Sequence, residues 1–226
     1  MTIEIPRGVA FLGGTFDPVH SGHLALAREA LRALRVMRVE LLPAGNPWQK
    51  TWVTPGHHRL AMLRSALEGE ERISVDTTEL LETGPTYTVR TLDKLRRRYG
   101  PSVPLVLLMG SDQWRNLHTW YDWERLTYYA HVAVCRRAGE TPQAEPAVEA
   151  HAAPRTVAAH ELVDAGAFGR VAFFDMPPHA ASSTALRRIF ARSAFPDAMR
   201  ETDGWLPYPV ARYIRENRLY VRAVRP

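Results

Sequence analysis

The chain has 226 residues, of which 46% are hydrophobic and 23% are charged, and its formal net charge is +5 at pH 7. Such a chain can bury a substantial core, and its composition is that of a soluble globular protein. No apolar run is long enough and free enough of charge to span a bilayer, and the N-terminus lacks the pattern of a secretory signal, so no membrane partner is expected.

The single cysteine and the distribution of basic residues narrow the setting further. Cys135 lies in the apolar run "AHVAVCRR", so we expect a small buried side chain in a reducing, cytoplasmic compartment and not a nucleophile. Lys and Arg are spread out, apart from "KLRRRYG" at 94–100, which we interpret as the solvated C-terminal turn of a helix. Mild basicity suits small anionic substrates such as nucleotides as well as RNA, and no nucleic-acid partner is predicted.

Hydrophobic periodicity predicts strands and helices that alternate along the chain. The predicted strands are 9–13, 38–44, 72–80, 104–110, 131–137 and 170–176. The predicted helices are 23–34, 54–69, 86–100, 116–130, 183–192 and 209–217, with Thr54 as the N-cap of the second. We therefore expect an α/β fold, namely a Rossmann-like doubly wound parallel sheet with helices on both faces and a small C-terminal helical segment.

The same pattern predicts a single domain over 1–226, with its C-terminal helical portion at about 182–226. The stretch 138–161 is rich in Ala, Pro and Glu and interrupts the alternation of strands and helices. We interpret it as a surface excursion and not as a domain boundary, because the predicted strand 170–176 continues the same sheet.

A glycine-rich connection follows the first predicted strand. Gly13 and Gly14 end that strand, and His20 and His23 flank Gly22 at the start of the next helix. Glycines at the carboxyl end of a strand let backbone N–H groups approach a phosphate, and the helix N-terminus adds positive potential. Two histidines three residues apart could also ligate a metal or simply pack, but no third ligand at zinc spacing accompanies them. Phosphate binding is favoured.

Two segments at opposite ends of the chain carry a family resemblance. "GGTFDPVHSGH" at 13–23 resembles the signature of the H-x-G-H nucleotidylyltransferases, and "SSTALR" at 182–187 resembles that superfamily's S-S-T-x-[IL]-R motif. The resemblance implies that both motifs meet ATP phosphates, with the histidines stabilising the reacting α-phosphate. The residues so implied are Gly13, Gly14, Thr15, Phe16, His20, His23, Ser182, Ser183, Thr184 and Arg187.

The middle of the chain indicates which member of the superfamily this is. "GPTYTVRTLDKLR" at 84–96 and "LVLLMGSDQWRNLHTWYDWERL" at 105–126 resemble bacterial nicotinate-nucleotide adenylyltransferases. The resemblance implies that Thr88, Trp120 and Tyr121 hold the nicotinate ring, with backbone amides on its carboxylate. It also implies that Gly110 and Asp112 lie at the adenosine ribose, although Asp112 would equally serve as a helix N-cap. The other indoles in this stretch, Trp114 and Trp123, are as well explained by core packing.

One segment departs from the family pattern. Where the family has Pro-Pro-His-[KR], this chain has "NPWQK" at 46–50, so Lys50 keeps the expected cation while Gln49 replaces the histidine. Lys50 is expected on the triphosphate or on the acceptor phosphate, and Thr15 is also expected near the acceptor. His57 and His58 are assigned to the surface of the second helix.

The resemblance implies an enzyme that transfers the adenylyl group of ATP to nicotinic acid mononucleotide, with His20, His23, Lys50 and Arg187 as the catalytic residues. Mg²⁺ would arrive with ATP and no protein metal site is expected. The alternatives are a related adenylyltransferase that uses nicotinamide mononucleotide or phosphopantetheine, and a nucleotide-sensing or RNA-binding module without catalysis. Both motifs being intact weighs against the last of these. Whether the chain forms a homo-oligomer is left open.

Overall fold

A parallel sheet forms the centre of the protein. The structure is a computed structural model and describes residues 7–46, 53–82, 84–137 and 139–221. Within these residues the sheet has six strands in the order β3-β2-β1-β4-β5-β6, and every neighbouring pair is parallel. The strands are β1 (Val9–Gly14), β2 (Arg38–Pro43), β3 (Ile73–Val75), β4 (Leu105–Gly110), β5 (His131–Arg137) and β6 (Val171–Met176). This strand order defines a doubly wound Rossmann-like sheet and confirms the expected fold class.

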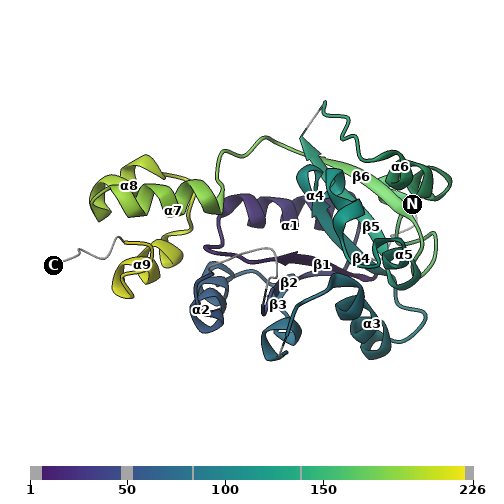
Figure 1. The fold of residues 1–226 in the computed structure, drawn as a ribbon, viewed down its shortest axis with the longest axis horizontal. Coiled ribbons are helices and arrows are strands. Elements are labelled where there is room, and N and C mark those ends of the chain that lie inside the picture. The colour runs from purple at the N-terminus through teal and green to yellow at the C-terminus, as the bar shows by residue number, and fades with distance from the viewer. Residues whose placement is uncertain (1–6, 47–52, 83, 138, 222–226) are drawn as a thin grey trace.

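Helices cover both faces of the sheet, as Figure 1 shows. Alternate residues of a strand point to opposite faces, so Ala10 and Leu12 pack with one group of helices and Val9 and Phe11 with the other. The first group contains α1 (Ser21–Ala33) and α2 (Gly56–Ala66), and the second contains α3 (Thr88–Tyr99) and α6 (Pro146–Ala152). Because both faces are covered, the strands are almost continuously apolar.

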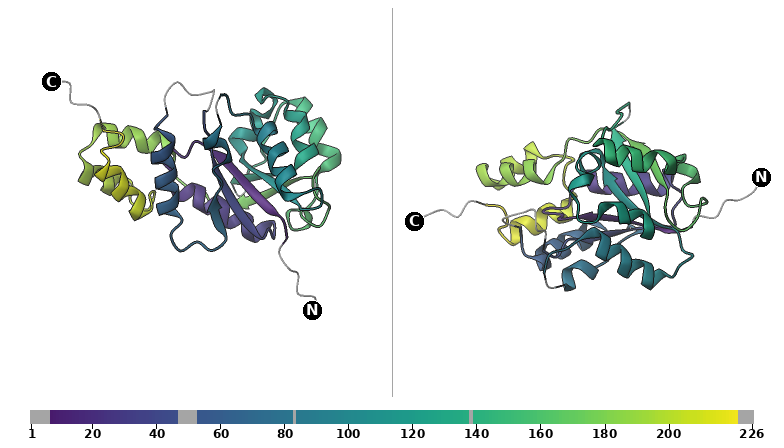
Figure 2. Two further views of the ribbon diagram at one scale, coloured as in Figure 1. Left: turned by 90° about the horizontal axis from the view of Figure 1, so that it is seen from below. Right: turned by 45° about the vertical axis from the view of Figure 1, so that its right-hand side comes forward.

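Three short helices follow the sheet. They are α7 (Ser183–Arg192), α8 (Phe195–Glu201) and α9 (Tyr208–Glu216), and they lie together at one end of the molecule (Figures 1 and 2). Leu186 and Val210 are buried in the same apolar cluster as α1. The sequence predicted two helices here, and it missed α8, which begins at Phe195 directly before a proline.

The predicted helix 116–130 is wrong. The chain instead forms α4 (Ser111–Arg115), two 3₁₀ turns (Leu117–Thr119 and Trp123–Arg125) and α5 (Leu126–Tyr129). Asp122 adopts a left-handed conformation with φ of 54°, which no α-helix accommodates. This break leaves Trp120 and Tyr121 in an irregular connection beside β4. Trp114, by contrast, is fully buried against Phe173 with 5.5 Å between ring centroids.

The stretch 138–161 is not a simple surface excursion. It contains α6, whose Val148 and Ala152 are buried in the core cluster on the second face of the sheet. It is therefore part of the crossover from β5 to β6. Pro146 is the first residue of α6, where its missing N–H costs no hydrogen bond.

Two other boundaries differ from the prediction. The strand predicted over 72–80 ends at Val75, because the Asp76 carboxylate accepts the Thr78 N–H at 2.7 Å and turns the chain into a 3₁₀ helix. The second helix begins at Gly56 with Pro55 as its N-cap, so Thr54 is not the cap. On α2, His57 is exposed as expected, whereas His58 is half-buried and its Nδ1 lies 2.9 Å from the Tyr213 hydroxyl.

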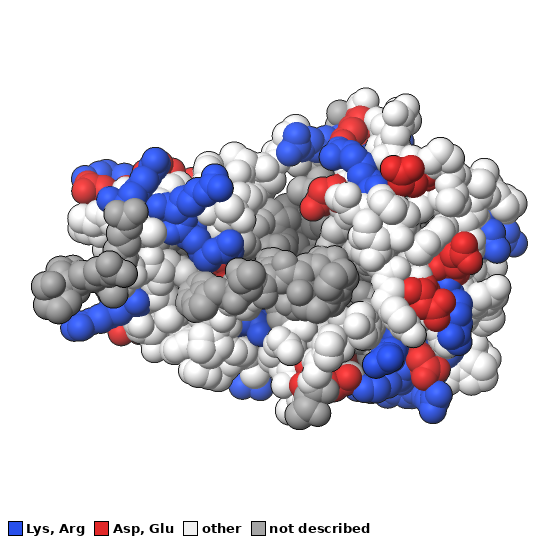
Figure 3. Space-filling model, in the orientation of Figure 1, with Lys and Arg blue, Asp and Glu red and all other residues white. Residues whose placement is uncertain are grey.

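The basic run at the end of α3 is only partly solvated. Lys94, Arg97 and Arg98 are exposed, and blue side chains gather over this part of the molecule and over the C-terminal helices in Figure 3. Arg96 is half-buried instead. Among the helices of the described residues, none is long and apolar enough to cross a membrane.

Candidate active site

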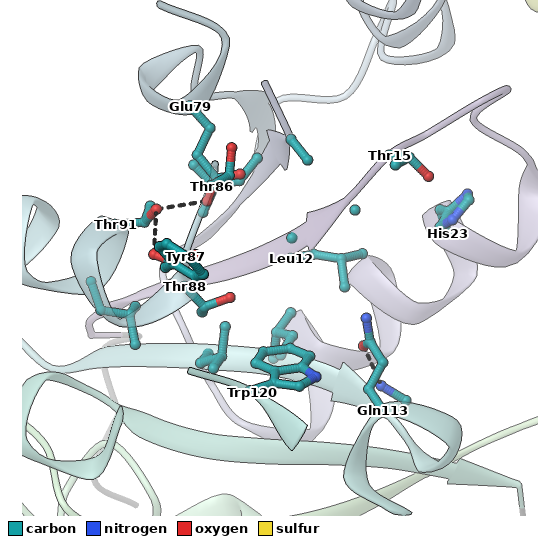
Figure 4. Close-up of a pocket in the computed structure, with 18 of the residues that line it drawn as sticks. Leu12, Thr15, His23, Glu79, Thr86, Tyr87, Thr88, Thr91, Gln113 and Trp120 are labelled. Carbon is teal, nitrogen blue, oxygen red and sulfur yellow. Dashed lines mark hydrogen bonds between the residues drawn. The ribbon is translucent and has the colours of Figure 1, made fainter. Parts of the chain in front are cut away.

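A cleft of about 470 Å³ opens at the carboxyl ends of β1, β2 and β4, where ligands bind in doubly wound sheets. Figure 4 shows His23 at one end and Glu79, Thr86 and Thr91 at the other, with Leu12 between them. Many of the expected site residues line this cleft, namely Gly13, Gly14, Thr15, His20, His23, Thr88, Gly110, Asp112, Trp120, Tyr121 and Ser183. One continuous hollow thus joins both ends of the expected site.

The two histidines stack at the start of α1. Their ring centroids are 3.7 Å apart, and the His20 backbone N–H donates to the His23 Nδ1 at 3.2 Å. His23 therefore helps to cap its own helix, and its Nδ1 is the acceptor in that bond. When the ring is neutral, its Nε2 carries the proton and is the donor.

His20 is the N-cap residue of α1 and is 7% exposed. Burial lowers its pKa to about 4, with a smaller contribution from His179, so the ring is neutral at pH 7 in this structure. Its Nδ1 is buried without a hydrogen-bond partner among the described residues. An anionic phosphate beside this ring would favour the protonated form and raise the pKa. A cationic His20 would thus be a property of the complex.

The glycine-rich turn is tightly built. A side chain at Gly14 would come within 3.2 Å of the Phe16 ring, so the turn tolerates only glycine there without movement. Phe16 has φ of 50° and is 1% exposed, and its ring meets the His23 ring edge-on at 4.9 Å. Such conformations of non-glycine residues concentrate at functional sites. Phe16 packs against the His23 ring and is not among the residues that line the cleft.

The end of β4 forms the opposite wall. A Cβ atom at Gly110 would lie 2.8 Å from the Asp112 Oδ1, so glycine permits this close turn into α4. The Gly110 N–H donates to the Gln113 Oε1 at 3.2 Å. Gly110 is the N-cap, and Asp112 lies in the first turn with an exposed side chain. The N-cap alternative for Asp112 is therefore wrong.

Aromatic side chains close the end of the cleft that lies away from His23 (Figure 4). The Tyr87 and Tyr121 rings are 4.7 Å apart, and the Arg90 guanidinium lies over both, 5.0 Å and 5.6 Å from their centroids. Thr88 is the first residue of α3, so its backbone N–H is not used inside the helix. Trp120 faces the same hollow in Figure 4. This end offers an aromatic face together with backbone donors.

Sequence reasoning missed a buried acid in the cleft. Glu79 is 6% exposed, lines the cleft and accepts the Thr91 hydroxyl at 2.7 Å. Burial raises its pKa to about 7, although the hydrogen bond from Thr91 lowers it. Glu79 lies near the end of the predicted strand 72–80, shortly before the "TYT" segment at 86–88. A carboxyl so close to predicted acceptor residues is a signal that could have drawn attention to it.

The second motif contributes unevenly. Ser183 lines the cleft and donates to the Pro18 carbonyl at 2.9 Å, whereas Ser182 and Thr184 are exposed. The Ser182 Oγ caps α7 by accepting the Ala185 N–H at 3.1 Å. Arg187 donates from Nη1 to the Asp17 carbonyl at 2.6 Å and is not among the residues that line the cleft. Lys50, Gln49 and Trp48 lie outside the described residues.

The turn also depends on a buried arginine that was not predicted. Arg59 of α2 is 2% exposed, and it donates to the Thr15 carbonyl at 2.9 Å and to the Thr54 carbonyl at 2.8 Å. The sequence held a signal for it, because Arg59 shares the buried face of α2 with Met62 and Leu63 at helical spacing. A charge on such a face must be satisfied by local partners.

Known proteins match this fold and site. The family model described as cytidylyltransferase-like matches residues 11–189. A solved structure of Plasmodium falciparum nicotinic acid mononucleotide adenylyltransferase, complexed with NaAD, has the same fold with a TM-score of 0.69 and 16% identity, covering 95% of this chain and 97% of that one. The same protein complexed with APC gives a TM-score of 0.64 at 15% identity, covering 95% and 97%.

Relatives of closer sequence narrow the class. A protein of Laribacter hongkongensis named "probable nicotinate-nucleotide adenylyltransferase" is 39% identical, covering 97% of each chain. Proteins of the same name from Bordetella petrii and Herminiimonas arsenicoxydans are 38% and 35% identical, covering 95% and 96% of this chain and 99% and 98% of theirs. The chain belongs to the cytidylyltransferase-like family and, within it, to the nicotinate-nucleotide adenylyltransferases.

Proposed function

We propose that this enzyme transfers the adenylyl group of ATP to nicotinic acid mononucleotide, giving nicotinic acid adenine dinucleotide and pyrophosphate in NAD biosynthesis. One observation carries the proposal: a single cleft joins the histidine pair at the start of α1 to an acceptor end walled by Tyr87, Trp120 and Tyr121. Family membership supports the same reaction.

The reaction is an in-line displacement at phosphorus. A phosphate oxygen of the mononucleotide forms a bond to the α-phosphorus of ATP, and the bond from that phosphorus to the bridging oxygen of pyrophosphate breaks. No general base is required, because a phosphate monoester is mostly dianionic at neutral pH. The protein's tasks are to position the two phosphates and to stabilise the charge that develops.

Four residues are proposed for charge stabilisation. His20 and His23 line the phosphate end of the cleft and would donate hydrogen bonds to phosphoryl oxygens. Lys50 and Arg187 would add positive charge. In this structure the Arg187 guanidinium holds the Asp17 carbonyl, so contact with phosphate requires it to share or exchange that bond. Gly13, Gly14 and Ser183 are proposed as phosphate contacts, with Ser182 and Thr184 nearby at the start of α7.

The acceptor end is proposed to select a carboxylate. Backbone N–H groups at Thr88 and Tyr121 would donate to the nicotinate carboxylate while Trp120 stacks on the ring. A carboxamide presents its own N–H donors to the same groups, so it is disfavoured. Gly110 and Asp112 are proposed at the adenosine ribose, and Thr15 lies between the two substrates.

A divalent metal ion usually accompanies nucleotidyl transfer in this class. We propose Mg²⁺ bound chiefly through the ATP phosphates, since Mg²⁺ commonly keeps several waters and takes few protein ligands. In the part of the chain that the structure describes, His, Cys, Asp and Glu side chains form no group of three that could hold a metal. When bound, the ion would supply neutralisation of phosphate charge.

We also propose that residues 1–226 act as one domain, because the core cluster that contains α1 and the sheet continues into α7 and α9. A cytoplasmic location remains a prediction from the lone cysteine.

The test is pyrophosphate release by the purified enzyme with ATP and nicotinic acid mononucleotide, compared with nicotinamide mononucleotide and phosphopantetheine. Preference for the nicotinate acceptor is expected. Equal rates with the nicotinate and nicotinamide forms would refute the acceptor specificity, and no release with any acceptor would favour a non-catalytic nucleotide-binding module.

A further inference from the structure

The turn between β1 and α1 is held by segments that are distant in sequence. Arg59 of α2 donates to the Thr15 carbonyl, Ser183 of α7 donates to the Pro18 carbonyl, and Arg187 donates to the Asp17 carbonyl. Residues 16–20 are all buried. The backbone that leads from this turn to His20 is therefore buried and bonded to α2 and α7.

Asp17 is the centre of these contacts. It is 2% exposed, its Oδ2 accepts the Thr54 N–H at 3.1 Å, and its Oδ1 accepts the Tyr220 hydroxyl at 2.6 Å. Arg59 supplies the nearby positive charge, since Asp17 acts electrostatically on the Arg59 guanidinium. A buried carboxylate needs such partners, because leaving one of its oxygens without a donor costs the desolvation of a charged group.

Tyr220 comes from the segment after α9. Its hydroxyl donates to the Asp17 Oδ1 and lies 3.9 Å from the Met62 sulfur. Burial raises its pKa well above the usual range, with Asp17 as the next cause, so the phenol keeps its proton and acts only as the donor. Tyr220 has φ of 65°, a left-handed conformation that its surroundings must stabilise.

We propose that Tyr220 is a positioning residue for adenylyl transfer, because its hydroxyl fixes the Asp17 carboxylate and thereby the turn that sets the place of His20. The reaction itself rests on the proposed function. Asp17 and His20 are separated by only two residues, so a shift of the carboxylate is transmitted directly to the histidine. A displacement of about 1 Å of a group that contacts the reacting atoms can reduce the rate by about a hundredfold.

The matched comparison is Tyr220→Phe against Tyr213→Phe. Both variants remove one tyrosine hydroxyl that joins the C-terminal segment to a distant part of the chain, since the Tyr213 hydroxyl lies 2.9 Å from the His58 Nδ1 of α2 and the Tyr220 hydroxyl bonds Asp17. Tyr213→Phe is expected to lower the melting temperature by a few degrees, roughly the effect of one lost hydrogen bond, and Tyr220→Phe is expected to lower it further, because an oxygen of the buried Asp17 carboxylate also loses its donor. Tyr220→Phe removes a bond to Asp17 in the turn, whereas Tyr213→Phe removes a bond to α2.

With ATP and nicotinic acid mononucleotide, Tyr220→Phe is expected to lower kcat at least about tenfold while the acceptor KM changes less than about threefold. Tyr213→Phe should keep kcat within about twofold. Equal kcat values in the two variants would overturn the proposal. Asp17→Asn keeps the shape but replaces one carboxylate oxygen by an NH2 donor, so the side chain can no longer accept from both the Thr54 N–H and the Tyr220 hydroxyl. It should lose rate as Tyr220→Phe does and serves if Tyr220→Phe does not fold.

A second measurement does not depend on the acceptor. Burial lowers the pKa of His20 to about 4, and NMR of its ring protons would follow this titration in the wild type and in both variants. In Tyr220→Phe the pKa should move toward 6.5, and in Tyr213→Phe it should stay. An unchanged His20 titration in Tyr220→Phe overturns the proposal. Failure of the wild-type enzyme to use nicotinic acid mononucleotide would refute the proposed function alone.

Discussion

The two histidines of the H-x-G-H segment have unequal environments although they stack on each other. The His23 Nδ1 accepts the His20 N–H at the start of α1, and the His23 ring packs edge-on against the Phe16 ring. The orientation of the His23 ring is therefore fixed before any ligand binds. His20 is more deeply buried, is neutral at pH 7 and leaves its Nδ1 without a partner among the described residues. Because His20 is poorly solvated, an anionic phosphate bound beside it would raise its pKa more than that of a solvated histidine.

His23 is proposed to donate to the reacting phosphate, and substitution by alanine would remove this preoriented side chain from the cleft. His23→Ala is expected to lower the turnover of ATP and nicotinic acid mononucleotide at least about a hundredfold, or about 2.7 kcal/mol of transition-state stabilisation. Steady-state rates of pyrophosphate release measure it. His57→Ala, at an exposed histidine of α2, is the control and should be as active as the wild type. Near-normal turnover in His23→Ala would remove the histidine from the chemistry.

At the scale of elements, Arg96 joins the end of α3 to three loops. Its guanidinium donates to the carbonyls of Tyr129, Gly100, Val103 and Ala167, with distances of 2.7–3.0 Å. No carboxylate is needed, because carbonyl oxygens satisfy all the donors that a guanidinium presents. Arg96 therefore ties α3 to the loops before β4, β5 and β6.

Arg96→Met is expected to destabilise the protein by about 2–4 kcal/mol, because several carbonyls lose their donor at once. The melting temperature should fall by roughly 5–10 °C for a chain of this length. Arg97→Met is the control, since Arg97 is exposed and pairs with Asp93 one turn away on α3, a contact of about 0.5 kcal/mol. Equal melting temperatures for the two variants would contradict this role of Arg96.

Elements with a strong apolar period were predictable from the sequence. Strands such as 131–137 and the helix 183–192 have the expected bounds because local pattern and burial agree. The predicted helix 116–130 failed because Asp122 takes a left-handed conformation that no periodicity reveals. The interpretation of 138–161 failed because Val148 and Ala152, which are buried in the core, reach it only when the whole sheet is assembled.

The residues of the candidate site also fall into those that a local pattern predicts and those that it does not. Residues in contiguous motifs, such as Gly13, His20 and His23, line the cleft as expected. Asp17 and Tyr220 were not predictable as partners, since no period links positions 203 apart. Long-range pairing depends on tertiary packing, which a single sequence shows only through local propensity.

At the scale of the whole molecule, two groups in the cleft make stability depend on pH with opposite signs. Burial raises the pKa of Glu79 from 4.5 to about 7, so the folded protein holds this proton more tightly, and stability falls as pH rises from about 4.5 to about 7. Burial lowers the pKa of His20 from 6.5 to about 4, so stability falls as pH decreases through that range. Between about pH 4.5 and 6.5 the two dependences oppose each other.

Glu79→Gln removes the pH dependence of stability that comes from Glu79 and leaves the one that comes from His20. Relative to the wild type, the free energy of unfolding of the variant should decrease by about 3 kcal/mol between pH 7.5 and pH 4.5, since 2.5 pKa units at about 1.36 kcal/mol each stabilise only the wild type at low pH. Urea unfolding at several pH values measures it. Glu68→Gln, at an exposed carboxyl, should follow the wild type. Parallel profiles for Glu79→Gln and the wild type would show that Glu79 does not titrate in this range.

The bond between Tyr220 and Asp17 also sets an order in time. A ribosome that adds about 5–20 residues per second makes Tyr220 about 10–40 s after Asp17, because 203 positions separate them. The turn between β1 and α1 is thus made well before Tyr220, and the contacts from Arg59 and Ser183 can form before the contact from Tyr220. A nascent chain would carry every residue of the first motif and most of the cleft without the contact that fixes His20. The full rate should therefore be reached only after Tyr220 has been made and has bonded Asp17.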